Sequence, residues 1–213
     1  GIGLMAVLYF YVPAQKLEDV IDCGLKLSEW KDRNQATPWS DAKPCIRAFL
    51  HPMDDKRHGD PTFKCIKLDV PVEYCVVGDN DLYQLSLEHP EIHKTYMENM
   101  VPLDKYLFGS FRSPECLVFT TVLSDQLSPL GKGLGDPILY ENSQTLYVNN
   151  LLERYNSCYD EINQVLLYSF LTLQKQNGCI EGLQSDEKGL AVFYNGEMSH
   201  PITVPIPDFR KYS

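Results

Sequence analysis

The sequence lacks the features that identify most common protein classes. Its longest apolar run near the start, residues 6–12, is far shorter than the roughly 20 residues that a membrane span requires, and no basic segment with a cleavage site precedes it. The chain contains no GxSxG, HExxH or GxxxxGKS/T motif. These absences predict a soluble, unprocessed, cytoplasmic protein with no membrane partner. They argue against nucleophile-elbow hydrolases, HExxH zinc enzymes and P-loop nucleotidases.

The cysteines do not follow the sequence spacings that are typical of metal ligands or of disulfide frameworks. The seven cysteines are an odd number, form no CxxC pair and mostly lie in apolar runs, which predicts reduced thiols in the core. His89 and His93 are four residues apart, but Pro90 lies between them and no ligand glutamate accompanies them. Asp79 and Asp81 have two interpretations: their carboxylates could bind a hard cation, or they belong to a helix-capping turn. The capping turn is the interpretation that we favour. No metal is therefore predicted.

Basic charge is scarce and local. The net charge is −10, yet residues 26–67 hold 9 Lys+Arg against 6 Asp+Glu, a local net of +3. An acidic chain lacks the clustered lysines and arginines whose counterion release drives non-specific nucleic-acid binding. This distribution argues against long duplex nucleic acid as a partner. A small anionic ligand held by a few basic residues is one interpretation of the local excess, and ordinary fluctuation is the other.

The first part of the chain reads as a strand followed by a short helix. Residues 6–12 are aromatic and β-branched and are ended by Pro13, which predicts a buried strand. Leu17, Val20 and Ile21 repeat at helical spacing, and Gly24 stands where a helix would stop. Residues 28–44 turn polar and predict a loop or broken helix, whose Trp30 and Trp39 cover the core or line a cleft. The core is the interpretation that we favour for both.

The remaining segments predict an α+β protein in two parts. Further strands are expected at residues 45–50, 63–70, 74–77 and from 115 to about 124, and a helix at residues 91–100. Residues 143–176 lack Pro and Gly and carry apolar side chains at helical spacing, so one long helix or two consecutive ones should pack on the sheet. Asn195-Gly196 predicts a terminal β-hairpin. We expect a mixed, mostly antiparallel sheet in residues 1–140, and a helical and hairpin extension in residues 141–213 packed on it.

Glu115 is the most informative single residue of the chain. It opens the strand Glu115-Cys116-Leu117-Val118, which is otherwise apolar. Surface glutamates usually lie on the polar faces of helices, whereas a carboxylate at the head of a buried strand is a common place for a site residue. Glu115 is therefore the candidate around which a site is sought.

Three short motifs lie in order at residues 9–25, 48–53 and 115–118, and together they resemble the ADP-ribosyltransferase fold and within it the DarT family of DNA-modifying transferases. The first strand leads to a helix that ends in Gly-Leu, as Tyr9-Phe10-Tyr11-Val12 leads to Cys23-Gly24-Leu25 here. The second motif, an aromatic strand followed by Pro-Met, is matched by Ala48-Phe49-Leu50-His51-Pro52-Met53. The third is the strand that opens at Glu115. The resemblance covers about the first 125 residues and implies the split sheet of that fold.

The resemblance implies NAD as the co-substrate and a role for each matched residue. Glu115 would be catalytic, since a fixed carboxylate stabilises the oxocarbenium-like state in which the nicotinamide–ribose bond breaks. The residues that would bind NAD are Tyr9, Tyr11 and Phe49 around the nicotinamide, and Arg47, His51, Arg57 and Arg112 toward the pyrophosphate. Arg112 has the alternative of pairing with Glu115 or a neighbouring acid.

The sequence departs from the family pattern at two points, which leaves two alternatives to an enzyme. Pro13 stands near the family's nicotinamide-side histidine, and Leu50 or His51 stands where an arginine precedes Pro-Met. One alternative is therefore a nucleotide-binding module without catalysis. The other is a protein-interaction module, or a homodimer, that uses the C-terminal helix. Its exposed aromatic surface would consist of Tyr147, Tyr155, Tyr159 and Tyr168.

Overall fold

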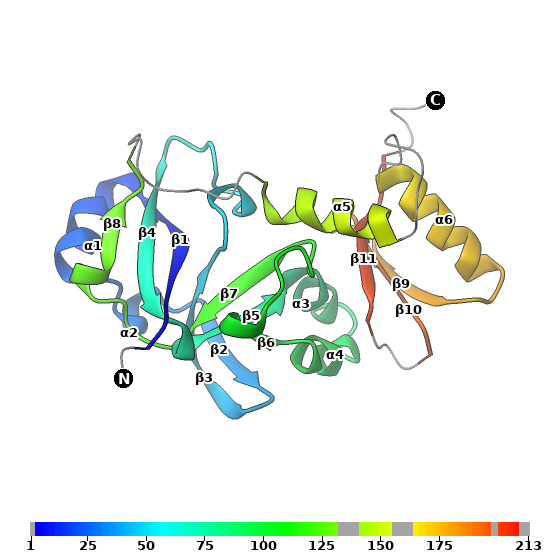
Figure 1. Cartoon of the computed structure of the whole chain (residues 1–213), viewed down its shortest axis with the longest axis horizontal. Helices are drawn as coiled ribbons and strands as arrows, with labels where there is room; N and C mark the ends of the chain where they lie inside the picture. The colour runs from blue at the N-terminus through cyan, green and yellow to red at the C-terminus, as the bar shows by residue number, and fades with distance from the viewer. Residues whose placement is uncertain (1–2, 132–140, 155–163, 197–199, 209–213) are drawn as a thin grey trace.

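The chain folds as an α+β protein with three antiparallel sheets (Figure 1). The computed structural model describes residues 3–131, 141–154, 164–196 and 200–208. Every strand pair among these residues is antiparallel. The predicted α+β class is therefore confirmed, whereas the sheet predicted to be mixed and mostly antiparallel is antiparallel in every described pair.

Two of the sheets meet in the N-terminal part of the chain. One has the order β1-β4-β8 and consists of β1 (Met5–Pro13), β4 (Phe63–Pro71) and β8 (Leu127–Pro129). The other has the order β2-β3-β7-β5-β6 and consists of β2 (Arg33–Thr37), β3 (Ser40–Ala48), β7 (Pro114–Val118), β5 (Cys75–Asp79) and β6 (Val101–Pro102). A single antiparallel bridge between Tyr9 and Phe49 joins β1 to the end of β3. Leu8, Phe10 and Val12 of β1 share one apolar core with Ile46 and Ala48 of β3.

Short helices follow the strands and cover them. They are α1 (Leu17–Cys23), α2 (Leu27–Trp30), α3 (Asn80–Ser86), α4 (Ile92–Glu98), α5 (Ser143–Arg154) and α6 (Gln164–Gln176). Single 3-10 turns lie at Ala14–Lys16, Pro52–Asp54, Val72–Tyr74, Leu103–Lys105 and Ser124–Gln126. Asp79 caps α3 because its carboxylate accepts the N–H groups of Asp81 and Leu82. The capping turn predicted there is confirmed.

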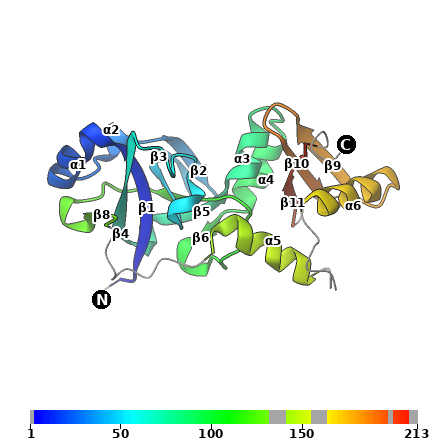
Figure 2. The ribbon, with the colours of Figure 1, turned by 90° about the horizontal axis from the view of Figure 1, so that it is seen from above.

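The third sheet, of β9 (Glu181–Ser185), β10 (Leu190–Tyr194) and β11 (Ile202–Pro205), is covered on both faces. Leu190 and Val192 of β10 pack on α3 and α4, while Ala191 and Phe193 pack on α5 and α6. The apolar run of β10 is continuous for this reason, since both of its faces are buried. Figures 1 and 2 show α3 and α4 between this sheet and the five-stranded sheet.

The C-terminal part agrees with one of the two helical alternatives predicted for it and corrects the predicted hairpin. The described residues contain two helices, α5 and α6, and no single long helix, and the residues between them, 155–163, lie outside the described part. The terminal hairpin of β10 and β11 is two strands of a three-stranded sheet. Tyr147 does not contribute to an exposed surface, because α5 turns it into the core beside Phe193. Tyr168 is half-buried, and Tyr155 and Tyr159 lie outside the described residues.

The polar stretch of residues 28–44 is the other segment where the prediction is wrong. It forms α2 and the hairpin of β2 and β3 instead of a loop or broken helix. Trp30 packs edge-on against Phe10 in the core, as favoured from the sequence, but Trp39 at the hairpin tip is 57% exposed. Polar side chains fit here because β2 is the edge strand of its sheet.

Replacement of Gly24 by alanine is expected to destabilise the fold. Gly24 ends α1 at φ +80° and ψ −178°, and a Cβ atom there would lie 2.5 Å from the carbonyl oxygen of Val122. That backbone region is open essentially to glycine alone and costs other residues about 1–3 kcal/mol, to which the clash adds. Gly59→Ala is the matched control, because Gly59 has φ +83° and open space around it. Urea denaturation should show a clearly larger loss for Gly24→Ala. Equal losses would mean that the contact with Val122 adjusts freely.

Candidate functional site

Glu115 stands at the head of β7, between β3 and β5, and its side chain is fully buried at 0% exposure. Gly78 lies opposite it on β5, on the face of the sheet that α4 covers. A Cβ atom on Gly78 would come within 2.9 Å of the Tyr96 hydroxyl, so the glycine makes room for Tyr96 of α4 to reach Glu115. The local sequence therefore places a carboxylate and a phenol together inside the protein.

Two arginines and a tyrosine hold the carboxylate. Arg33 of β2 donates from Nη2 to Oε1 at 2.7 Å, and Tyr96 donates its hydroxyl proton to the same oxygen at 2.8 Å. Arg47 of β3 donates from Nε to Oε2 at 2.7 Å. In the amide orientation that satisfies both of its ends, Asn80 also donates to Oε2 at 3.3 Å and accepts from Nη2 of Arg47 at 3.2 Å. Both carboxylate oxygens are thus occupied.

Burial and the charge of Glu115 together set the protonation of its partners. Burial lowers the pKa of the Arg33 guanidinium, but the adjacent Glu115 charge raises it, and the net shift is upward. Burial, followed by the Glu115 charge, raises the pKa of the Tyr96 phenol above its ordinary value. Arg33 therefore stays charged and Tyr96 stays protonated, as donors to Glu115. A buried carboxylate is tolerated only with such partners.

The two arginines differ in how firmly they are fixed. Arg33 lies 3.8 Å above the ring of Tyr83 and also donates to Asp32 and Gln35. Its side chain is 13% exposed, whereas that of Arg47 is 28% exposed. Arg47 rests 4.9 Å from the ring centroid of Phe49. Arg47 is therefore the guanidinium that a ligand can reach and move more easily.

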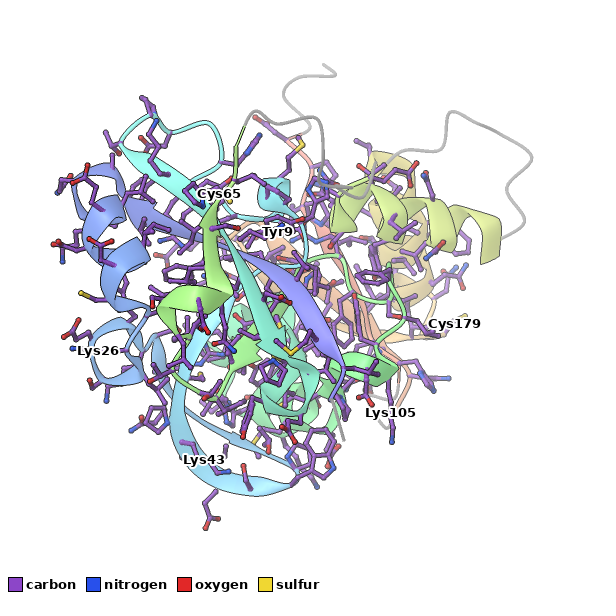
Figure 3. All side chains as sticks on the ribbon, turned by 60° about the vertical axis from the view of Figure 1, so that its left-hand side comes forward. Tyr9, Lys26, Lys43, Cys65, Lys105 and Cys179 are labelled. Carbon is purple, nitrogen blue, oxygen red and sulfur yellow. The ribbon has the colours of Figure 1, made fainter. Side chains whose placement is uncertain are left out.

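The structure brings some of the predicted site residues to Glu115. Arg47 contacts it directly, Phe49 lies under Arg47, and Tyr9 is joined to Phe49 through two backbone hydrogen bonds of 2.8 and 2.9 Å. Figure 3 shows Tyr9 near the middle of the molecule, whereas Lys43 projects into solvent at the outer part of the β2–β3 hairpin. Arg47, Phe49 and Tyr9 thus form a chain of contacts that runs from Glu115 to β1.

Three other predicted residues form a separate group beside β1. Arg57 binds the carboxylate of Asp55 with two of its nitrogens and donates to the carbonyl oxygen of Tyr11 at 3.1 Å. The Tyr11 hydroxyl donates to the carbonyl oxygen of Pro52. His51 is buried and accepts the N–H of Met53 through Nδ1. These hydrogen bonds all lie within residues 11–57, and none of them involves Glu115.

Arg112 lies elsewhere. It binds Asp81 of α3 through two hydrogen bonds of 2.7 and 2.6 Å, and Asp81 also accepts the hydroxyl of Thr203. The alternative stated from the sequence, a pairing with a neighbouring acid, describes this arrangement. Asp79 and Asp81 accordingly serve a helix cap and an ion pair. Among the residues that the structure describes, no group of three or more His, Cys, Asp or Glu is placed to hold a metal ion.

Sequence reasoning missed three residues of the Glu115 cluster, Arg33, Tyr96 and Asn80. Arg33 lies in the stretch interpreted as a loop, Tyr96 in a predicted helix, and Asn80 in the capping turn. The signal that could have found Arg33 was the local basic excess of residues 26–67, which also contains Arg47 and Arg57. The contacts of Arg33 and Tyr96 with Glu115 join residues 82 and 19 positions apart, and no local pattern encodes such pairings.

Comparisons of the chain with family models, with curated proteins and with solved structures found no match. In the part of the chain that is described, the structure contains no helix with both the length and the apolar character needed to cross a membrane. The interpretation of the site therefore depends on its own geometry and on the motifs that it contains.

Replacement of Asp79 by asparagine is expected to stabilise the fold as the pH rises. Burial, followed by the charge of Asp81, raises the pKa of Asp79 well above its ordinary value. The folded protein therefore holds this proton to a higher pH than the unfolded chain, and the wild type loses stability above the ordinary carboxyl pKa of about 4. Asparagine keeps the helix cap without the charge.

Unfolding free energies should coincide for wild type and Asp79→Asn below that pH and diverge above it, with the variant more stable. Asp125→Asn, at an exposed position, is the charge-matched control and should show little difference. Equal free energies of unfolding for the wild type and Asp79→Asn from pH 4 to pH 8 would show that ionisation of Asp79 does not destabilise the folded protein.

Proposed function

We propose that the chain binds NAD and breaks its nicotinamide–ribose bond, passing ADP-ribose to an acceptor or to water. The observation that carries the proposal is the fixed Glu115 carboxylate at the head of β7, with two arginines from neighbouring strands converging on it. A carboxylate near the anomeric carbon stabilises the positive charge that develops as the bond breaks. The arginines supply charges that suit a pyrophosphate.

Access to Glu115 requires one of its partners to move. Both of its oxygens accept hydrogen bonds, so a ribose hydroxyl can approach only when a donor leaves. In this proposal Arg47 is the donor that a substrate displaces, because its side chain is more exposed than that of Arg33. Its salt bridge with Glu115 involves one of the two carboxylate oxygens, Oε2. A pyrophosphate would compete with Glu115 for its guanidinium, and Oε2 would then face the ribose.

The surface beside Arg47 suits the nicotinamide ring. Phe49 lies directly under the Arg47 guanidinium, and Tyr9 lies across the bridge from β1. Once Arg47 turns to the pyrophosphate, the face of Phe49 becomes available for stacking. Arg57 has no comparable freedom because Asp55 and the Tyr11 carbonyl hold it. The proposal therefore assigns phosphate contact to Arg47 and leaves Arg57 as a support of β1.

Incubation of the protein with NAD tests this function. Chromatography should show free nicotinamide that increases with time and with protein concentration. Isothermal titration should show saturable binding of NAD and of ADP-ribose, since both carry the pyrophosphate. Arg47→Ala should weaken both affinities by about 10-fold, which corresponds to 1.4 kcal/mol, whereas Lys43→Ala at an exposed site of the same strand should change neither. Absence of saturable binding to either compound would reject the proposal.

A nucleotide-binding module without catalysis is the second candidate. It is favoured by the complete burial of Glu115 and by the occupation of both of its oxygens. In this case ADP-ribose and NAD would bind with similar affinity and no nicotinamide would be released. The same two measurements therefore separate the two candidates.

A further inference from the structure

A cavity of about 700 Å³ lies on the side of the molecule where the core meets α5 and β11. Its lining includes Asp79 at the end of β5, Phe108 and Phe111 from the loop before β7, and Tyr147 and Asn150 from α5. A volume of this size is within the range of small-molecule sites, about 300–1,000 Å³. None of Glu115, Arg33, Arg47 and Tyr96 lines it.

Asp79 contributes a buried carboxylate whose second oxygen has no partner among the described residues. Oδ1 accepts the N–H groups of Asp81 and Leu82, and no hydrogen bond of the described residues reaches Oδ2. The residue is only 4% exposed. Every side-chain oxygen or nitrogen of the described residues that is fully covered has a hydrogen-bond partner. Since Oδ2 has none among these residues, it is not fully covered, and we infer that it faces the cavity that Asp79 lines.

The charges around Asp79 are not balanced within the described part of the chain. Arg112 forms its two hydrogen bonds with Asp81, and no ion pair among the described residues includes Asp79. Two carboxylates therefore share one guanidinium, and Asp79 is the carboxylate that lines the cavity. Burial, followed by the Asp81 charge, raises the pKa of Asp79, and the opposing effect of the Arg112 charge does not offset them. A ligand cation would supply the missing charge.

The walls above Asp79 suit the body of such a ligand. Phe108, Phe111 and Tyr147 bring three aromatic rings to the lining, and aromatic faces attract cations as well as apolar groups. Asn99 and Asn150 add amide groups that give a polar molecule its orientation. Gly109 keeps this arrangement compact, because its φ of +85° brings the loop against Leu146 and Asn150 of α5.

We propose that this cavity binds a small organic cation, an amine carried on an aromatic or apolar body, with the ammonium group at Asp79. The site is separate from the proposed NAD site. Cys75, Val77 and Asp79 are alternate residues of β5, so their side chains point to the same face of the five-stranded sheet. Cys75 and Val77 belong to the apolar core on that face. Glu115 points to the opposite face with Tyr96.

Titration with three probes that share one ring tests the proposal in the absence of NAD. Phenethylamine carries an ammonium group, 2-phenylethanol is neutral and phenylacetate is an anion. By isothermal titration phenethylamine should bind saturably, at least about 10-fold more tightly than 2-phenylethanol, which is the effect expected of a charge-assisted hydrogen bond. Phenylacetate should not bind.

Two variants assign the binding to this cavity. Asp79→Asn keeps the helix cap and should weaken phenethylamine binding by about 10-fold while leaving 2-phenylethanol within about twofold. Phe108→Ala, at a half-exposed side chain, should weaken both probes. Asp125→Asn should change neither. Unchanged phenethylamine affinity in Asp79→Asn, equal binding of amine and alcohol, or no saturable binding of the amine would each overturn the proposal. These outcomes are independent of NAD binding, so the two proposals fail separately.

Discussion

Glu115→Ala is expected to lower the free energy of unfolding by about 3–5 kcal/mol, the usual cost of removing one partner from a buried ion pair. The substitution leaves Arg33 and Arg47 with donors that have lost their acceptor, and it leaves the Tyr96 hydroxyl without its partner. Arg33 is the costlier of the two arginines because its side chain is only 13% exposed. Urea denaturation with linear extrapolation measures the loss.

Glu98→Ala is the matched control for this prediction. Glu98 is an exposed residue of α4 whose ion pair among the described residues is with Lys94 at 3.7 Å, and exposed pairs contribute about 0–1 kcal/mol. A large loss for Glu115 with a small one for Glu98 would establish that the buried cluster holds β2, β3, β7 and α4 together. A loss below about 1 kcal/mol at Glu115 would mean that the arginines relax into solvent, and that the cluster contributes little to folding.

Glu115→Gln is expected to reduce nicotinamide release by about 100-fold to 1,000-fold, the range seen when one group that stabilises transition-state charge is removed. Glutamine has nearly the same shape and still accepts a hydrogen bond, but it carries no negative charge to place beside the ribose. NAD affinity should change far less, because in this account Arg47 and Phe49 make the binding contacts. Release is measured at saturating NAD, with the folded fraction checked by circular dichroism.

Glu98→Gln is the control for turnover and should keep the wild-type rate. Glu115→Gln is less disruptive to folding than the alanine variant, since one oxygen remains to accept from an arginine. Wild-type turnover in folded Glu115→Gln would remove the catalytic role of this residue. Lost turnover together with lost NAD binding would instead point to a binding role.

Several strands and the first helix were predictable because their apolar patterns are local. Residues 6–12 are continuously apolar and became β1, and the spacing of Leu17, Val20 and Ile21 before Gly24 gave α1. Glu115 was found for the same reason, because a single acid in an apolar strand is visible in the sequence. The C-terminal helices were also found, since two consecutive helices were one of the two alternatives predicted for residues 143–176.

The remaining features depend on pairings between distant parts of the chain. β2 has the sequence Arg-Asn-Gln-Ala-Thr, which shows no apolar alternation, and it forms a strand because β3 returns beside it. Arg33 was therefore missed although it is a direct partner of Glu115. The three-stranded C-terminal sheet was not predicted for a related reason. The apolar run of β10 does not show that helices cover both of its faces.

A crystal structure of Glu115→Gln soaked with NAD tests the central claim most directly. The account predicts that the ribose of the nicotinamide half lies within hydrogen-bond distance of residue 115, that Arg47 has left this residue for the pyrophosphate, and that the ring stacks on Phe49. NAD bound elsewhere, with Arg47 still paired to residue 115, would contradict it.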